Sequence, residues 1–204
     1  MAEYRRIYND VFAREVNYRL AEHSPGLITC IRHSASLRWL RGRALDFGCG
    51  AGFVVEWLSR RPFQFQCWGV DVSDEAVSLT KQRVSNIPGM EDGTRILRVD
   101  PGPLPFEDGS FQLVTCFDVL EHLDQADMLS AFGEMRRVLR PGGIWFGSVS
   151  CRPSGTIDHS GENLHRTVRG VDWWLEQLEP DLAEFDAHLQ QLTLFKRPRA
   201  LVQP

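Results

Sequence analysis

The stretch Leu45-Asp46-Phe47-Gly48-Cys49-Gly50-Ala51-Gly52 decides the fold of this chain. Its first residues predict a buried strand. The three alternate glycines that follow allow a sharp turn and let a ligand lie against backbone that carries no Cβ. A helix is expected to start near Phe53. Such a loop at the carboxyl end of a first parallel strand is typical of a nucleotide-type cofactor site.

The spacing of these glycines narrows the choice of cofactor. A dinucleotide fingerprint, Gly-x-Gly-x-x-Gly/Ala, counted from Gly48 needs a third small residue at position 53, where Phe53 stands. A Walker loop is excluded because no Lys-Ser or Lys-Thr pair follows the glycines. The remaining pattern, acidic-x-Gly-x-Gly-x-Gly from Asp46 to Gly52, resembles motif I of class I S-adenosylmethionine-dependent methyltransferases.

Further segments resemble the same family, in the order in which its motifs occur. They are the second strand Gln66–Asp71, the third strand Arg95–Val99 with Asp100 after it, residues 104–123 around strand four, and residues 137–143 at the turn into strand five. The resemblance therefore covers residues 40 to 150, most of the chain. It implies an α/β fold, a three-layer α/β/α sandwich whose doubly wound, mostly parallel seven-stranded sheet has an antiparallel last strand.

The resemblance also implies a methyltransferase with S-adenosylmethionine as its cofactor. A carboxylate at the tip of the second strand, Asp71, would accept from both ribose hydroxyls, and Asp100 would accept from the adenine amino group. The residues expected at the cofactor are Asp46, Gly48, Gly50, Gly52, Asp71, Val72, Asp100 and Phe117. Because the acidic residues of this set are intact, the sequence favours an active enzyme over a non-catalytic cofactor-binding subunit.

The chain is expected to form one domain with a helical extension at its start. Residues 1–40 predict an N-terminal helical cap, with helices over Tyr4–Leu20 and Leu27–Leu40, and residues 41–204 the methyltransferase domain. Tyr4, Tyr8 and Tyr18 face the pocket in one interpretation and pack the cap onto the sheet in the other. Near the end of the chain we expect a helix over Val171–Leu178 and a last strand over Gln191–Phe195.

Composition limits the partners and the compartment. The net charge is −4, which disfavours nucleic acid as a substrate. No apolar run has membrane-spanning length, and no leader pattern stands at the start, so we expect neither a membrane partner nor secretion. The five cysteines form no Cys-x-x-Cys pair, so neither a disulfide framework nor a zinc site is indicated, and a cytoplasmic location is expected.

The acceptor side of the site is expected after strands four and five. Asp118, Glu121 and His122 follow strand four, and His165 lies in the loop after strand five. Two carboxylates and two imidazoles suit Mg²⁺, Mn²⁺ or Zn²⁺. The pattern is similar to that of metal-assisted O-methyltransferases, including those that act on small RNA and in the ubiquinone pathway. Three interpretations stay open: a metal site, catalysis by His122, His165 and Glu121 without metal, or a structural role.

Basic residues in the late loop bear on the acceptor. Arg152, Arg166 and Arg169 suit an anionic or sugar-like small molecule, since guanidinium groups bind phosphate and carboxylate. Alternatively they are solvated and pair with Asp158 and Glu162. The sequence as a whole predicts O-methylation of a hydroxyl on a small molecule, sugar or glycoconjugate. N-methylation and a regulatory cofactor-binding role are the alternatives.

Overall fold

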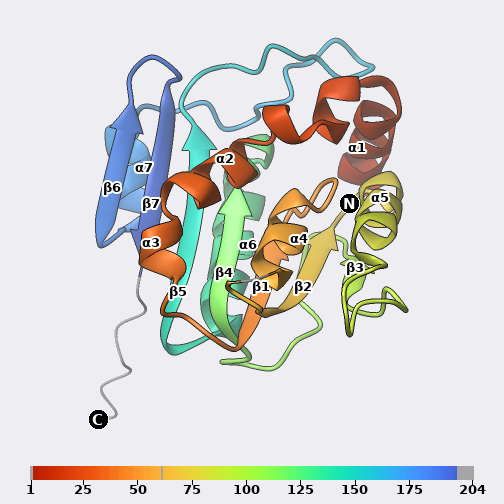
Figure 1. Ribbon diagram of the computed structural model, residues 1–204. Coiled ribbons are helices and arrows are strands. Elements are labelled where there is room, and N and C mark those ends of the chain that lie inside the picture. Colours follow the sequence, from red (N-terminus) through yellow and green to blue (C-terminus); the bar gives the residue numbers. More distant parts are fainter. Residues whose placement is uncertain (1, 61, 197–204) are drawn as a thin grey trace.

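A seven-stranded sheet forms the centre of the molecule within residues 2–60 and 62–196, the part of the chain that the computed structural model describes. The strand order is β3-β2-β1-β4-β5-β7-β6, as Figure 1 shows. The strands are β1 (Arg43–Phe47), β2 (Gln66–Asp71), β3 (Ile96–Arg98), β4 (Phe111–Phe117), β5 (Leu139–Ser150), β6 (Leu182–Asp186) and β7 (Gln191–Lys196). Neighbouring strands from β3 to β5 are parallel, and β7 is antiparallel to both β5 and β6. The predicted sheet, with its antiparallel last strand, is confirmed.

Helices cover both faces of this sheet and give three layers (Figure 1). They are α1 (Ala2–Arg14), α2 (Pro25–Arg32), α3 (Ser34–Leu37), α4 (Phe53–Ser59), α5 (Asp74–Val84), α6 (Gln125–Val138) and α7 (Val171–Leu178), with short 3₁₀ helices η1 (Val16–Arg19), η2 (Ala21–His23) and η3 (Leu120–His122). Side chains alternate between the faces, as a strand requires. Ala44 and Leu113 pack with α2 to α5, whereas Leu45 and Val114 pack with α6 and α7.

The N-terminal cap is more broken than the two predicted helices. The first helix ends at Arg14, where the Arg19 side chain folds back and donates to the carbonyl of Phe12. The next begins after Ser24, whose hydroxyl accepts from the Leu27 amide as an N-cap, with Pro25 in the first turn. The predicted break between the two helices is therefore present, but the first helix ends six residues earlier than predicted, and the second is divided into α2 and α3.

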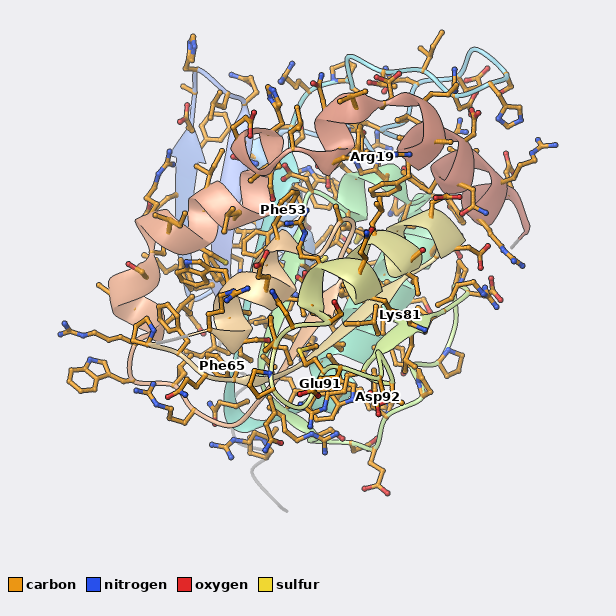
Figure 2. All side chains as sticks on the ribbon, turned by 45° about the vertical axis from the view of Figure 1, so that its right-hand side comes forward. Arg19, Phe53, Phe65, Lys81, Glu91 and Asp92 are labelled. Carbon is orange, nitrogen blue, oxygen red and sulfur yellow. The ribbon has the colours of Figure 1, made fainter. Side chains whose placement is uncertain are left out.

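Other elements lie where the sequence places them. The helix α4 begins at Phe53, α7 has the predicted bounds, and the predicted last strand extends by one residue to Lys196. Residues of the predicted domain beyond 196 lie outside the described part. Figure 2 shows Arg19 at one end of the molecule and Glu91 and Asp92 at the opposite end, the loop before β3. None of the described helices combines the length and apolar character that crossing a bilayer requires.

Candidate functional site

A cavity of about 560 Å³ lies at the carboxyl ends of the parallel strands. Its floor comes from the loops after β1, β2, β3, β4 and β5, and its roof from α1, η1 and the segment before α2. Among the predicted cofactor residues, those that line it are Asp46, Gly48, Gly50, Asp71, Val72, Asp100 and Phe117. Gly52 does not line it, so its role lies elsewhere. This edge is where open parallel sheets bind their ligands.

The three glycines after β1 are required for different reasons. All three have positive φ: +73° at Gly48, +52° at Gly50 and +80° at Gly52. A Cβ on Gly48 would overlap Val119, and one on Gly52 would come within 3.0 Å of Thr80. Those two glycines allow close packing, whereas a Cβ on Gly50 would meet only the Phe12 ring, at 3.4 Å across the cavity. Gly50 is therefore the glycine that opens backbone to a ligand.

Asp71 is held rigidly at the tip of β2. Its Oδ2 accepts from the Gly50 amide at 2.9 Å and its Oδ1 from the Ser73 amide at 2.9 Å. Burial raises the pKa of this carboxyl, and the two amides act in the opposite direction. The carboxylate keeps lone pairs that face the cavity, which suits the two adjacent hydroxyls of a ribose.

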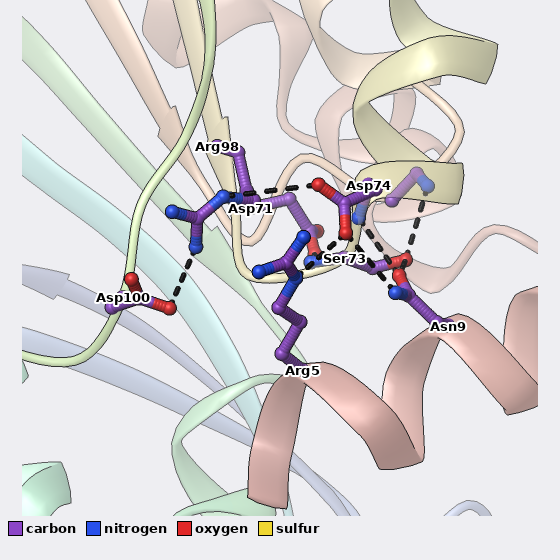
Figure 3. Close-up of polar contacts among 8 residues, drawn as sticks. Arg5, Asn9, Asp71, Ser73, Asp74, Arg98 and Asp100 are labelled. Carbon is purple, nitrogen blue, oxygen red and sulfur yellow. Dashed lines mark hydrogen bonds and ion pairs between the residues drawn. The ribbon is translucent and has the colours of Figure 1, made fainter. Parts of the chain in front are cut away.

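The other two acidic residues lie in contrasting surroundings. Asp46 is buried, its Oδ1 accepts from the Thr115 hydroxyl at 2.7 Å, and burial raises its pKa to about 7. Asp100 is exposed and its Oδ1 accepts from Arg98 at 2.6 Å, which lowers its pKa (Figure 3). Asp100 therefore presents a charged acceptor at the cavity rim, already shared with an arginine.

Glu121, His122 and His165 come together, as predicted, although their segments are far apart in sequence. One nitrogen or oxygen of each lies within 4.8 Å of the others. The two imidazole rings meet edge to face with 4.6 Å between centroids. Each side chain lines the cavity. A three-donor group of this kind fits a proton-transfer site or a divalent cation.

Backbone carbonyls select the tautomer of both histidines. Nδ1 of His122 lies 3.2 Å from the carbonyl of Leu164, and Nδ1 of His165 lies 2.6 Å from the carbonyl of Arg152. A carbonyl only accepts, so each Nδ1 carries the hydrogen and each Nε2 keeps a free lone pair. Burial lowers the pKa of His122 to about 3 and also lowers that of His165, which favours the neutral form of both rings.

The buried carboxyl of Glu121 is only half satisfied. Its Oε1 accepts from the Ser150 amide at 2.8 Å, and its Oε2 has no hydrogen-bond partner among the described residues. Burial raises its pKa well above the usual range, with the Asp118 charge adding to the effect. A proton shared with an imidazole Nε2, or a cation, would satisfy this oxygen.

Asp118, the fourth residue of the predicted metal set, is not in this group. It adopts a left-handed φ of +52° at the end of β4, and its carboxylate accepts from Ser148 at 2.7 Å and from Gln191 at 2.9 Å. Ser148 and Gln191 were not anticipated from sequence. Ser148 and Gln191 lie close to each other because β5 pairs antiparallel with β7, and no local sequence motif predicts that pairing.

The predicted arginine cluster does not form in the cavity. Arg152 lines it, but Arg166 pairs with the buried Asp158 at 2.7 Å. Arg169 donates to the carbonyl of its neighbour Val168, and its guanidinium lies over the Trp173 ring. The alternative interpretation, structural pairing within the loop, is confirmed for Arg166.

The roof is aromatic. Tyr4, Tyr8 and Phe12 recur every four residues along α1 and line the cavity, with Tyr18 of η1 beside them. Tyr8 meets the His122 ring edge to face at 5.7 Å. The interpretation that the tyrosines face the pocket is confirmed, and Phe12 is an addition that its four-residue spacing from Tyr8 would have revealed.

Comparison with known proteins agrees with this geometry. A family profile described as "Methyltransferase domain" matches residues 45–147. The chain is 32% identical over 166 residues to a ubiquinone biosynthesis O-methyltransferase of Marinobacter nauticus, covering 74% of this chain and 63% of that protein. It is 34% identical over 101 residues to the methyltransferase GfsG of Streptomyces halstedii, covering 50% of this chain and 35% of that protein. The matches therefore span only about a third to two thirds of these relatives.

Solved structures share the fold over nearly the whole chain. The PH0226 protein from Pyrococcus horikoshii OT3 superposes with a TM-score of 0.74 at 19% identity, covering 94% of this chain and 98% of that one. A phosphoethanolamine N-methyltransferase 2 from Haemonchus contortus, in complex with S-adenosyl-L-methionine, gives 0.64 at 21% identity over 87% of this chain and 46% of that one.

Proposed function

Because the chain belongs to the methyltransferase-domain family, whose methyl donor is S-adenosylmethionine, we propose that it methylates a hydroxyl group on a small molecule. The observation that carries this proposal is the convergence of Glu121, His122 and His165 at the cavity. Bound S-adenosylmethionine supplies an electrophilic methyl group. Every other requirement of the reaction falls on the chain itself.

The cofactor end of the cavity supports this proposal. The Gly50 backbone is open to a ligand, and Asp71 presents a buried carboxylate fixed by two amides. We propose that Asp71 accepts from the ribose hydroxyls, Asp100 from the adenine amino group, and that Asp46, Val72 and Phe117 complete the contacts. Together these groups orient the methyl group toward the acceptor, and such orientation is the main source of rate in a direct displacement.

The acceptor end favours oxygen over nitrogen. A neutral amine needs little besides positioning, whereas a hydroxyl must lose a proton. His122 and His165 offer two bare Nε2 atoms held by backbone carbonyls, beside the buried carboxyl of Glu121. We propose that His165 accepts the hydroxyl proton of the acceptor, and that His122, whose pKa burial lowers to about 3, and Glu121 hold the hydroxyl in place.

A divalent cation is the second candidate for this group, and Glu121 Oε2, which has no hydrogen-bond partner within residues 2–60 and 62–196, favours it. Glu121, His122 and His165 would hold it, and it would supply polarisation of the acceptor hydroxyl. Neutral imidazoles are the form that binds metal, and burial, which lowers the pKa of both histidines, favours that form. The predicted fourth ligand, Asp118, is engaged by Ser148 and Gln191 instead.

The test is methyl transfer from labelled S-adenosylmethionine to catechol, a hydroxyl probe, and to phosphoethanolamine, an amine probe. We expect label in catechol, and a loss of at least about 100-fold in Glu121→Gln. The control is His159→Ala, because His159 is exposed in the same loop and does not line the cavity. Transfer to the amine alone, or wild-type activity in Glu121→Gln, would overturn the proposal.

A chelator separates the two candidates for proton removal. Activity that falls in excess chelator and returns with Mg²⁺, Mn²⁺ or Zn²⁺, while the cofactor stays bound, supports the cation. Full activity in excess chelator supports proton acceptance by the imidazoles alone.

A further inference from the structure

The helix α1 presents three different faces to the rest of the molecule. Tyr4, Tyr8 and Phe12 line the cavity. Arg5 and Asn9, again four residues apart, contact the start of α5. The third face packs Ile7 and Val11 on Leu164 of the loop after β5. Residues spaced by four share a helix face. The helix α1 therefore covers the cavity with one face, contacts α5 with the second and packs on the loop after β5 with the third.

Asn9 makes three hydrogen bonds across the gap to α5 (Figure 3). Its Oδ1 accepts from the Ser73 hydroxyl at 2.8 Å and from the Asp74 amide at 2.8 Å. Its Nδ2 donates to Asp74 Oδ2 at 3.1 Å. The Asp74 amide belongs to the first turn of α5 and has no partner within its own helix. Asn9 therefore caps α5 from a different helix.

The same turn carries the carboxylate expected at the ribose. The Ser73 amide donates to Asp71 Oδ1, and Asp71 Oδ2 accepts from Gly50. Contacts thus run without a break from α1 through Asn9, Ser73 and Asp71 to the glycine loop. The turn that Asn9 holds is the turn that orients Asp71.

Other contacts between α1 and the sheet edge are weaker. Arg5 pairs with Asp74 at 2.7 Å, and both side chains are nearly half exposed, so solvent screens the pair. The apolar contact of α1 is a small cluster of Ile7, Val11 and Leu164, separate from the two main cores. The Asn9 bonds are partly buried and therefore carry much of the attachment of α1 on this side.

We propose that Asn9 is a positioning residue for the cofactor. By capping α5 it holds α1 as a roof over the bound cofactor and keeps Asp71 in place. Release of the cofactor then requires α1 to separate from α5. This inference rests on the proposed function in one respect, that S-adenosylmethionine occupies the cavity beneath α1.

The experiment measures how fast S-adenosylhomocysteine, the demethylated product of the cofactor, leaves the protein. In Asn9→Ala we expect its dissociation rate to rise about 10-fold, since three hydrogen bonds are lost. Bound S-adenosylhomocysteine should also slow tryptic cleavage after Arg5 and Arg6 in the wild type, and much less in the variant. The control is Arg14→Gln, which removes an exposed pair with Asp10 on the same helix.

A charge swap distinguishes positioning from general stability. Asn9→Asp keeps an acceptor for the Ser73 hydroxyl and the Asp74 amide, but it places a second carboxylate beside that of Asp74. In the double variant, Asp74→Asn replaces the Asp74 carboxylate with an amide that can donate a hydrogen bond to the new carboxylate at position 9. We expect fast release in Asn9→Asp and slower release in the double variant. The inference is overturned if the dissociation rate of S-adenosylhomocysteine is unchanged in Asn9→Ala. It is also overturned if, across all variants, this rate simply correlates with the loss in melting temperature. Both outcomes leave the proposed function standing. A wild type that binds no S-adenosylhomocysteine overturns both.

Discussion

The two ends of the cavity are built in different ways. The cofactor end comes mainly from residues 46–72, with Asp100 and Phe117 added from the ends of the next two strands, and its central carboxylate, Asp71, is held by backbone amides. The acceptor end joins η3, the end of β5 and the loop 151–170, and its three side chains are held by backbone groups distant in sequence. A site built from residues that are neighbours in sequence can be recognised from a sequence motif. For a site built from distant segments, the sequence shows which residue types are available but not which of them meet.

The first prediction concerns a variant that disrupts the cofactor end of the cavity alone. Gly50→Val should reduce affinity for S-adenosylmethionine on the order of 1,000-fold or more, because a branched side chain at φ +52° is strained and projects into the cavity. Calorimetry measures the affinity. The control is Gly133→Ala, where a Cβ on α6 meets nothing within 4 Å. Normal binding by Gly50→Val would remove the glycine loop from the cofactor site.

The second prediction concerns a variant that disrupts the acceptor end and leaves the cofactor end intact. His165→Ala removes one bare Nε2 from the group, so kcat should fall about 100- to 1,000-fold. Affinity for S-adenosylmethionine should stay within about 2-fold of the wild type, because His165 touches none of the groups that hold Asp71. Steady-state kinetics and calorimetry on the same protein test both statements. Equal losses in kcat and in cofactor affinity would show that the two ends are not independent.

The contrast between the ends also explains what the sequence could predict. Asp71 and Gly50 both line the cavity, and their positions could be predicted because a strand, a turn and a helix start follow each other within a few residues. The sequence left two interpretations open for Arg166, the pocket or pairing with Asp158, because the folding of an irregular loop decides between them, and the structure shows the pairing. Asp118 was assigned to the metal set by its spacing from Glu121. Spacing could not show that Ser148 and Gln191, on two other strands, would bind it.

The third prediction compares two carboxylates within the cofactor end. Asp71→Ala should weaken cofactor binding about 10- to 100-fold, since a fixed charged acceptor is lost and two amides lose their partner. Asp100→Ala should cost less than about 5-fold, because Asp100 is exposed and already shared with Arg98. Calorimetry on both variants gives the comparison directly. A larger loss for Asp100 than for Asp71 would reverse the roles assigned to the two strand ends.

The smallest effect concerns Asp46, where burial raises the pKa to about 7 from its ordinary value of 3.8. A carboxyl with a raised pKa binds its proton more tightly in the folded state, so the folded protein should lose stability as pH rises from about 4 to 7. Above pH 7 this group should cause little further change in stability.

The Thr115 hydroxyl donates to Asp46 and favours the charged form, so Thr115→Val should raise the pKa of Asp46 further and extend the loss of stability above pH 7. We expect about 1 kcal/mol less stability at pH 8 than in the wild type, and a smaller difference at pH 5, where the carboxyl is protonated in both proteins. Denaturant unfolding at the two pH values measures the difference, and Thr94→Val, which removes an exposed hydroxyl bonded to Asp92, is the control. A difference that is the same at both pH values would show that Thr115 acts through packing and not through the charge of Asp46.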